Sequence, residues 1–328
     1  MPAAREDSQT PPGQPPYGDD CADGWVARIS AALTSSVRDL SSRPLPAGLH
    51  LVATPIGNLG DITPRALVTL AKADEVYCED TRLSRPMLAR FGVERRLKVY
   101  HEHNAAQARE AIVGALEEGR TVALISDAGM PGISDPGYKL TRAAQDAGYC
   151  VYTVPGASAV TAAITVSGLA SDRFLFAGFL PHKAAARRNR INELSSTTAT
   201  LVVYESPHRL ASALKDLHEI LGDREAAVTR ELTKKFEEVR RGPLGDLCEW
   251  ARTNPPRGEI VIVVDGAALP RGDDVDDAAI MRELDSLEES LKPGAAAKAV
   301  ASALGVPRGR VYDLIQARKE RTASRAKP

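Results

Sequence analysis

One loop of this chain combines residue types that are suited to holding a ligand. Residues 126–137 read S-D-A-G-M-P-G-I-S-D-P-G and follow an apolar run, Thr121–Ile125, with the length and β-branched content of a buried strand. Glycine permits positive φ and close approach of the backbone to a ligand, and proline fixes the path between such points. Because a simple connection needs only about 4–6 residues, we favour a ligand-binding loop over an elaborate structural turn.

Two further loops rich in glycine and proline follow predicted strands. They are Thr54–Asp61, which reads T-P-I-G-N-L-G-D, and Pro155–Ala159, which reads P-G-A-S-A. None of the three loops contains lysine or arginine, and the chain has neither a Walker A sequence nor a G-x-G-x-x-G after a strand. The loops offer backbone groups, small side chains and the carboxylate of Asp127. This set suits a ligand with ribose hydroxyls or a positive centre better than one with several phosphates.

A polar cluster, E-D-T-R at residues 79–82, stands directly after a predicted strand. One interpretation is structural: Asp80 or Thr81 caps the next helix, and Arg82 pairs with a carboxylate. The other is functional: Asp80 acts as a base or orienting group, and Arg82 contacts a phosphate or the substrate. The residue types alone leave both interpretations open.

A second polar cluster, Y-E-S-P-H-R at residues 204–209, joins a predicted strand to a predicted helix. Serine followed by proline predicts Ser206 as the N-cap and Pro207 at the first helical position. Glu205, His208 and Arg209 could also face a cleft.

Histidines and cysteines give little support for a metal site. His101 and His103 lie two apart in H-E-H-N, but no third ligand has a telling spacing. The cysteines, at positions 21, 78, 150 and 248, are far apart. We therefore expect no metal, and reduced thiols in a cytosolic protein.

Strands and helices alternate from residue 48 onward, which predicts an α/β fold with a largely parallel sheet. The expected strands include residues 49–53, 75–78, 97–100, 121–125 and 149–154, with helices between them. In such sheets ligands bind at the carboxyl ends of the strands. All three loops should therefore lie at one edge of the sheet and form a pocket.

The chain divides by composition into four parts. We expect a disordered, proline-rich extension over residues 1–47, with a weakly amphipathic patch near residues 25–40 that can form a helix. An α/β domain over residues 48–168 carries the three loops. A second α/β domain over residues 169–267 has adjoining strands and hence a mixed sheet. Residues 268–328 form an acidic linker and a basic tail that resembles a helix-turn-helix around Gly305, and nucleic-acid contact by this tail is left open.

Overall composition sets few limits on function. The chain has 328 residues, is 43% hydrophobic and 26% charged, and has a net charge of −1, which gives no global attraction to nucleic acid. Basic residues gather locally in the second domain, for example in R-E-L-T-K-K at residues 230–235. No apolar run has the length of a membrane span, and no secretory signal is recognisable. We expect a cytoplasmic protein.

Six motifs in order resemble one known family. T-P-I-G-N-L-G-D-I-T, E-D-T-R, H-E-H-N, S-D-A-G-M-P-G-I-S-D-P-G, Y-E-S-P-H-R-L and R-E-L-T-K-K-F-E-E are similar to the bacterial 16S rRNA (cytidine-2′-O)-methyltransferases of the tetrapyrrole methylase superfamily. The resemblance runs from about residue 49 to residue 264. It departs from the family pattern at Met130, where threonine is usual, and at Ala105, where an acidic residue is usual.

The resemblance implies a class III methyltransferase fold of two α/β domains, a homodimer, and S-adenosylmethionine bound between the domains. The implied cofactor-binding residues lie in the three loops: Thr54, Pro55, Ile56, Gly57, Asp127, Ala128, Gly129, Pro155, Gly156, Ala157 and Ser158. The implied substrate is a cytidine ribose of 16S rRNA, either as naked RNA or within the 30S subunit. No metal is implied.

Transfer of a methyl group to a ribose hydroxyl needs alignment and a group that accepts or orients the hydroxyl proton. By position we consider Asp80 first, then Glu205 and His208, with Arg82 holding a phosphate. Two alternatives remain at this point. A small-molecule methyltransferase of the tetrapyrrole type would share the fold and cofactor, and a non-catalytic nucleic-acid-binding protein would use the basic tail without needing the pocket.

Overall fold

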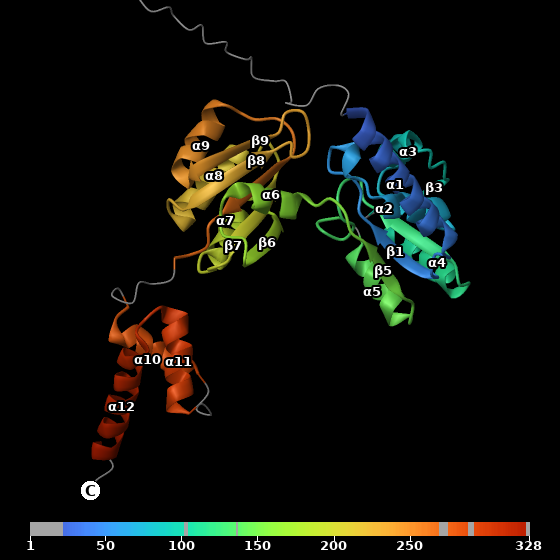
Figure 1. The fold of residues 1–328 in the computed structure, drawn as a ribbon. Helices are drawn as coiled ribbons and strands as arrows, with labels where there is room; N and C mark the ends of the chain where they lie inside the picture. Colours follow the sequence, from blue (N-terminus) through green and yellow to red (C-terminus); the bar gives the residue numbers. More distant parts are fainter. Residues whose placement is uncertain (1–21, 102–103, 136, 269–274, 288–291, 326–328) are drawn as a thin grey trace, which may run out of the picture. The chain divides into compact units, whose positions relative to one another are not determined.

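The computed structural model describes residues 22–101, 104–135, 137–268, 275–287 and 292–325 (Figure 1). The chain forms two compact units, Met1–Ser158 and Ala159–Pro328, each of which is described by itself below. Among the described residues, no helix combines the length and apolar character needed to span a bilayer.

The first unit is built on five parallel strands, as the alternation of elements predicts. The strands lie in the order β3-β2-β4-β1-β5, and β1 is paired on both sides, with Leu51 opposite Leu124 and Thr153. Their bounds are β1 Gly48–Val52, β2 Glu75–Cys78, β3 Leu97–Val99, β4 Thr121–Ile125 and β5 Val151–Val154. Because β4, β1 and β5 are neighbours and run in one direction, the loops that follow them leave the same edge of the sheet. The expected juxtaposition is confirmed.

Helices cover both faces of this sheet. Alternate residues of β4 point to opposite faces, so Ala123 and Ile125 join one buried cluster while Val122 and Leu124 join another. The first cluster includes residues of α2 (Pro64–Lys72) and α3 (Thr81–Arg90), and the second includes residues of α4 (Ala105–Glu117) and α5 (Tyr138–Asp146). A short 3₁₀ turn, η2 (Leu59–Asp61), lies in the first loop. Helix α2 begins with Thr63 as N-cap and proline at its first position, which is a typical helix start.

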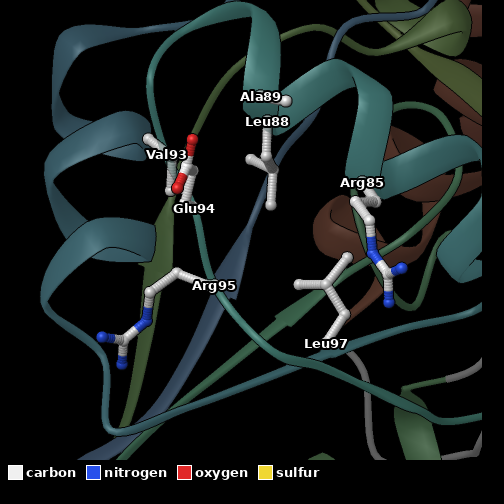
Figure 2. Close-up of a pocket in the computed structure, with 7 residues that line it drawn as sticks. All are labelled: Arg85, Leu88, Ala89, Val93, Glu94, Arg95 and Leu97. Carbon is white, nitrogen blue, oxygen red and sulfur yellow. The ribbon is translucent and has the colours of Figure 1, made fainter.

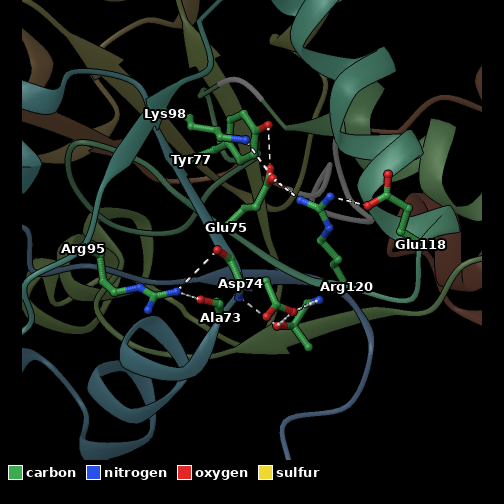
Figure 3. A network of polar contacts seen from close by, with 9 residues as sticks. Ala73, Asp74, Glu75, Tyr77, Arg95, Lys98, Glu118 and Arg120 are labelled. Carbon is green, nitrogen blue, oxygen red and sulfur yellow. Dashed lines mark hydrogen bonds and ion pairs between the residues drawn. The ribbon is translucent and has the colours of Figure 1, made fainter.

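A polar network fastens the amino ends of the strands, at the edge opposite the three loops (Figure 3). Asp74 Oδ2 accepts hydrogen bonds from the amide and the hydroxyl of Thr121, each at 2.7 Å, and the Asp74 amide donates to Thr121 Oγ1 at 2.9 Å. Glu75 beside it pairs with Lys98 at 2.7 Å and with Arg120 at 2.8 Å. The network ties β2 to both of its neighbours, β3 and β4.

The N-terminal extension contains more structure than the expected disordered segment over residues 1–47. Residues 1–21 lie outside the described part of the chain, but α1 (Ala22–Ser42) is a helix of 21 residues. Lys72 of α2 donates from Nζ to the Ser41 carbonyl at 2.7 Å and also to the Arg43 carbonyl. This ammonium group donates to carbonyls at the C-terminal end of α1 that have no partner within the helix, and its positive charge interacts favourably with the negative end of the helix dipole. The amphipathic patch near residues 25–40 is therefore a helix, as the sequence allows, and α2 supplies a partner for its C-terminal end.

The second unit is built on a mixed sheet, as the adjoining strands predict. Its order is β6-β7-β10-β8-β9, with β6 parallel to β7 and the other neighbours antiparallel. The strands are β6 Phe174–Phe179, β7 Thr200–Glu205, β8 Glu225–Arg230, β9 Glu238–Pro243 and β10 Ile260–Val264. Helices α7 (Ala184–Leu194), α8 (Leu210–Leu221) and α9 (Leu244–Thr253) contribute to one large core with the sheet.

Helix α6 (Ala159–Ser167) belongs to the second unit and not to the first domain, where the expected division placed it. The boundary predicted at residue 168 places this helix in the first domain, whereas the structure divides the chain after Ser158. Helix α6 packs against β8, β9 and β10 of the second sheet, and Arg241 of β9 donates to the Ser167 carbonyl at 2.9 Å. Sequence composition does not reveal which sheet an apolar helix will cover.

The C-terminal tail folds into three helices with a core of their own. They are α10 (Asp277–Ser286), α11 (Pro293–Leu304) and α12 (Arg308–Arg325). Val300, Val306 and Val311 are each at most 5% exposed and pack together with Ile280 and Ala297. Gly305 has φ 62° between α11 and α12, a left-handed conformation that glycine adopts readily. The predicted order of helix, glycine turn and helix is confirmed, while residues 269–274 of the expected linker lie outside the described part.

Candidate active site

The first two loops are joined by a short backbone bridge. The Thr54 amide donates to the Gly129 carbonyl at 2.8 Å, and the Gly129 amide donates to the Thr54 carbonyl at 3.0 Å. The Thr54 hydroxyl also donates to the Ser126 carbonyl at 3.1 Å. Gly129 has φ 82°, which a residue with a side chain rarely adopts. The threonine and the glycine together fix the loop after β4 against the loop after β1.

The third loop approaches the other two closely. A Cβ placed on Gly156 would lie 2.9 Å from the Cβ of Ala53, and one placed on Gly129 would lie 3.4 Å from Ile56 and 3.7 Å from the Ala157 carbonyl oxygen. Glycine at position 156 lets this loop approach Ala53 where a larger residue would force the backbones apart, whereas a Cβ on Gly129 would make ordinary contacts and the positive φ accounts for glycine there. The three loops therefore form one continuous surface at the carboxyl edge of the sheet.

The residues expected to bind a cofactor divide by exposure. The buried ones hold the loops in place, and the exposed or half-buried ones lie at the surface of the loops. Thr54, Pro55, Ile56 and Gly129 are buried; Asp127, Ala157 and Ser158 are half-buried; Gly57, Ala128, Pro155 and Gly156 are exposed.

Asp127 connects this surface to the end of β2. Its Oδ1 accepts the Asp80 amide at 2.9 Å, and partial burial raises the pKa of the Asp127 carboxyl. Asp80 caps α3 by accepting the Arg82 amide at 2.8 Å, and the Arg82 guanidinium reaches Asp80 Oδ2 at 2.7 Å. Hydrogen bonds from Arg82 hold the pKa of Asp80 below its ordinary value. The structural interpretation of E-D-T-R is therefore observed: Asp80 is a cap and an ion-pair partner.

Asp135 is a carboxylate that the sequence analysis did not single out. It lies in the same loop as Asp127, and burial, followed by the neighbouring charges of Glu79 and Asp127, raises its pKa to about 6. A hydrogen bond with Ser126 opposes this increase. The preceding residue, Ser134, has φ 60°, a strained conformation for serine that often occurs at ligand-binding sites. The sequence signal was present, because S-D recurs within the loop, but only burial distinguishes the second aspartate from the first.

Glu205, His208 and the predicted helix start lie in the second unit. The Glu205 side chain is fully buried at the end of β7 and pairs with Arg209 at 2.5 Å, while its Oε1 accepts the Ser206 amide at 2.7 Å. The prediction that Ser206 caps the helix is wrong. A turn over residues 206–209 comes first, and α8 begins at Leu210. The Glu205–Arg209 pair stabilises that turn, and His208 is exposed.

The sequence matches a known family over most of its length. The family described as Tetrapyrrole (Corrin/Porphyrin) Methylases matches residues 48–248. A protein of Mesorhizobium japonicum named Ribosomal RNA small subunit methyltransferase I is 50% identical over 276 residues, which is 84% of this chain and 93% of that protein. Proteins of the same name from Pseudomonas aeruginosa and Escherichia coli O157:H7 are 45% and 41% identical, covering 80% of this chain and 95% and 93% of those proteins. The chain belongs to this family of tetrapyrrole methylases.

Solved structures agree with this family's fold. Diphthine synthase aligns with a TM-score of 0.54 at 17% identity, covering 81% of this chain and 98% of that one. A cobalt precorrin-4 methyltransferase aligns with a TM-score of 0.51 at 18% identity, covering 66% and 94%. At these identities the likeness concerns the fold, which is the class III methyltransferase fold with a C-terminal helical addition.

Within the family's first α/β unit, a small pocket lies apart from the three loops. Arg85, Leu88, Ala89, Val93, Glu94, Arg95 and Leu97 line this pocket of about 210 Å³ (Figure 2). It lies between the C-terminal half of α3 and the start of β3, so it is not at the carboxyl edge. Its volume is below the roughly 300–1,000 Å³ that is usual for a ligand pocket.

No group of three or more potential metal ligands occurs in the described part of the chain. Glu102 and His103 of the H-E-H-N motif lie outside that part. His101 and Asn104 form a local turn, in which the His101 amide donates to Asn104 Oδ1 at 2.9 Å. This turn leads into α4.

Proposed function

We propose that this protein transfers a methyl group from S-adenosylmethionine to the ribose 2′-oxygen of a cytidine in 16S rRNA of the small ribosomal subunit. The observation that carries the proposal is the identity of 50% over nearly the whole length of a relative with the matching name. The proposal also includes a homodimer, which the resemblance to the family implies, and a location in the cytoplasm, which the sequence analysis leads us to expect.

The three loops fit S-adenosylmethionine by their chemistry. When bound, this cofactor supplies an electrophilic methyl group on a positively charged sulfur. The loops contain no lysine or arginine that would repel this charge, and Asp127 adds a half-buried carboxylate. The close contact of Gly156 with Ala53 leaves backbone rather than side chains on the surface. We assign cofactor binding to the exposed and half-buried members of the loops and loop positioning to the buried members.

The carboxylates of the first unit suit different tasks. An aspartate that is hydrogen-bonded to an arginine and has a lowered pKa is a weak proton acceptor, so Asp80 is best suited to orienting Arg82, which would hold a phosphate of the RNA. A carboxylate with a pKa near the working pH is a better general base, and Asp135 has a pKa of about 6. We therefore propose Asp135 as the proton acceptor ahead of Asp80.

Glu205 and His208 keep different proposed roles in the second unit. Glu205 is 2% exposed and paired with Arg209, an arrangement that suits positioning of the turn after β7. His208 is exposed on that turn and remains a candidate for contact with the RNA or for proton transfer.

The test is methyl transfer from labelled S-adenosylmethionine to purified 30S subunits of a strain that lacks this modification, with naked 16S rRNA in parallel. We expect label on the ribose of a single cytidine of the decoding region, located by mass mapping. Label on neither RNA substrate, together with tight binding of the cofactor, would reject rRNA and favour a small-molecule methyltransferase. Absence of cofactor binding would reject an enzyme altogether. Sedimentation of the pure protein separates a dimer from a monomer.

A further inference from the structure

Within the C-terminal tail, the part from α11 onward is basic, although the chain as a whole is nearly neutral. Residues 293–328 contain eight lysines and arginines and two acidic residues, whereas the whole chain has a net charge of −1. Such a local excess of positive charge attracts a polyanion. The catalytic proposal above makes no use of this segment.

Two of the arginines of α12 form ion pairs within the tail. Arg310 pairs with Asp277 at 2.8 Å, and Arg318 pairs with Asp285 at 2.6 Å. Both partners lie on α10, so these pairs fasten α12 to α10 and fix which face of α12 points outward.

One face of α12 carries side chains suited to RNA, of which Arg308 and Tyr312 are exposed and Gln316 is half-buried. Arg308, Tyr312 and Gln316 follow one another at intervals of four, so they lie along one stripe of the helix. Tyr312 is 42% exposed, whereas the adjacent Val311 is fully buried in the tail's core. Arg308 is exposed at the start of the helix, with Nη2 donating to the Gly294 carbonyl at 3.2 Å. Asp313, also exposed, is the acidic residue of this face.

We propose that the stripe of Arg308, Tyr312 and Gln316 on α12 binds the RNA substrate, an inference that rests on the proposed function. An arginine donates to phosphates and base edges, a tyrosine ring stacks on an unpaired base, and a glutamine amide both donates and accepts. The excess positive charge of residues 293–328 supplies attraction that does not depend on base sequence. The stripe contributes binding of the RNA and takes no part in methyl transfer.

The test uses the full-length protein with the double substitution Arg308→Ala and Tyr312→Ala. We expect KM for the 30S substrate, or for naked 16S rRNA if that is the substrate, to rise about tenfold, with kcat at saturation and the affinity for S-adenosylmethionine unchanged. We also expect the slope of log KM against log salt concentration to fall by about one for the lost arginine. Arg282→Ala, which removes an exposed arginine from α10, is the matched control and should leave KM unchanged.

The outcomes of these measurements test the RNA-binding role of the stripe separately from the proposed function. Equal KM values for the double variant and the Arg282→Ala control, with unchanged melting temperatures, would overturn the role of the stripe. If the wild-type protein methylates no rRNA, the proposed function fails, but fluorescence anisotropy with a labelled 16S rRNA fragment still tests the stripe. Weaker RNA binding by the double variant than by the control would then support it, and equal binding would reject it. Tighter binding of duplex DNA than of RNA, with the same sensitivity to the double substitution, would reject RNA as the partner.

Discussion

Three aspartates lie close together at the carboxyl edge of the first sheet, and their surroundings set their protonation differently. Arg82 holds the pKa of Asp80 down, whereas burial raises the pKa of Asp127 and brings that of Asp135 to about 6. A carboxyl group with a pKa of about 6 is mostly ionised at pH 7 and still accepts a proton readily. The site therefore separates a permanently charged orienting group from a titrating one.

The substitution Asp135→Asn tests this assignment. If Asp135 is the base, the wild-type rate should rise with pH through about 6 as the carboxyl ionises, and Asn should lower kcat by about 10²-fold or more and remove that rise. A raised pKa in the folded state means that ionisation of Asp135 disfavours folding as the pH rises from about 4 to 6. The variant should therefore be no less stable than the wild type at pH 7.

A pH profile of kcat at saturating substrate, with thermal unfolding at pH 7, measures both effects. Asp146→Asn, which alters an exposed ion pair on α5, is the control and should change neither. A variant that kept both its rate and its dependence on pH would remove Asp135 as the base.

Gly156 offers a second prediction at this scale, because its contact is with a side chain that cannot move aside. Gly156→Ala should place a methyl group about 2.9 Å from the Cβ of Ala53, which costs about 1–3 kcal/mol of stability and weakens cofactor binding. Gly114→Ala, in the middle of α4 with open space around it, should instead stabilise by up to about 1 kcal/mol. Urea unfolding and isothermal titration with the cofactor measure these effects; equal effects of the two substitutions would contradict the packing argument.

At the scale of elements, hydrogen bonds between Asp74 and Thr121 join β2 to β4 at the amino edge of the first sheet. Asp74 and Thr121 exchange three hydrogen bonds there, beside the Glu75 cluster that Figure 3 shows. The bonds from Thr121 keep the pKa of Asp74 below its ordinary value. These hydrogen bonds lie at the edge opposite the candidate site, so we assign them a role in stability rather than in catalysis.

Asp74→Asn should destabilise the protein by about 1 kcal/mol at pH 7, because the side chain is exposed and the lost bonds are partly replaced by water. A lowered pKa in the folded state means that this stabilisation is complete above about pH 4, the ordinary pKa of aspartate, and is lost as the pH falls through the lower, folded value. The difference from wild type should therefore shrink between pH 4 and pH 2. Urea unfolding at pH 7, 4 and 3 measures this trend, with Asp39→Asn on α1 as the control; a difference that stayed constant would refute the charge argument.

At the scale of the whole molecule, each unit has cores made of its own residues. The large cluster around β7 and β10 contains residues of the second unit alone, and the two clusters of the first sheet contain residues of the first unit alone. Proteins with separate cores often depart from two-state unfolding. Trp250 packs against the second unit's core, with the Arg240 guanidinium 4.7 Å from its ring, and so reports on that unit.

A Trp25→Phe variant leaves Trp250 as the single tryptophan. We expect its fluorescence to change at a different urea concentration from the far-ultraviolet circular dichroism, which reports on both units. Cofactor binding should move the two transitions by different amounts. Coincident transitions with and without the cofactor would show that the units unfold as one.

The sequence by itself determined the elements, the chemistry of the loops and their shared position. Alternating strands and helices can bury their apolar faces only around a parallel sheet, and loops after parallel strands must leave one edge. Asp80 as a cap, Thr63 as a cap and Gly305 as a turn were predictable because each depends on a few neighbouring residues.

The tertiary structure decided what depends on distant partners. Burial among Glu79, Asp127 and Ser126 distinguishes Asp135 from any other loop aspartate. Packing on β8, β9 and β10 assigns α6 to the second unit, and the Lys72 ammonium binds carbonyls at the C-terminal end of α1. Ser206 failed as a cap because Glu205 and Arg209 pair across the turn before α8. For Asp135 and α6 the deciding free energy comes from desolvation or packing against residues far apart in the chain, which local sequence preferences do not contain. The Ser206 prediction failed for a local reason, because the pairing of Glu205 with Arg209 competes with the capped helix start.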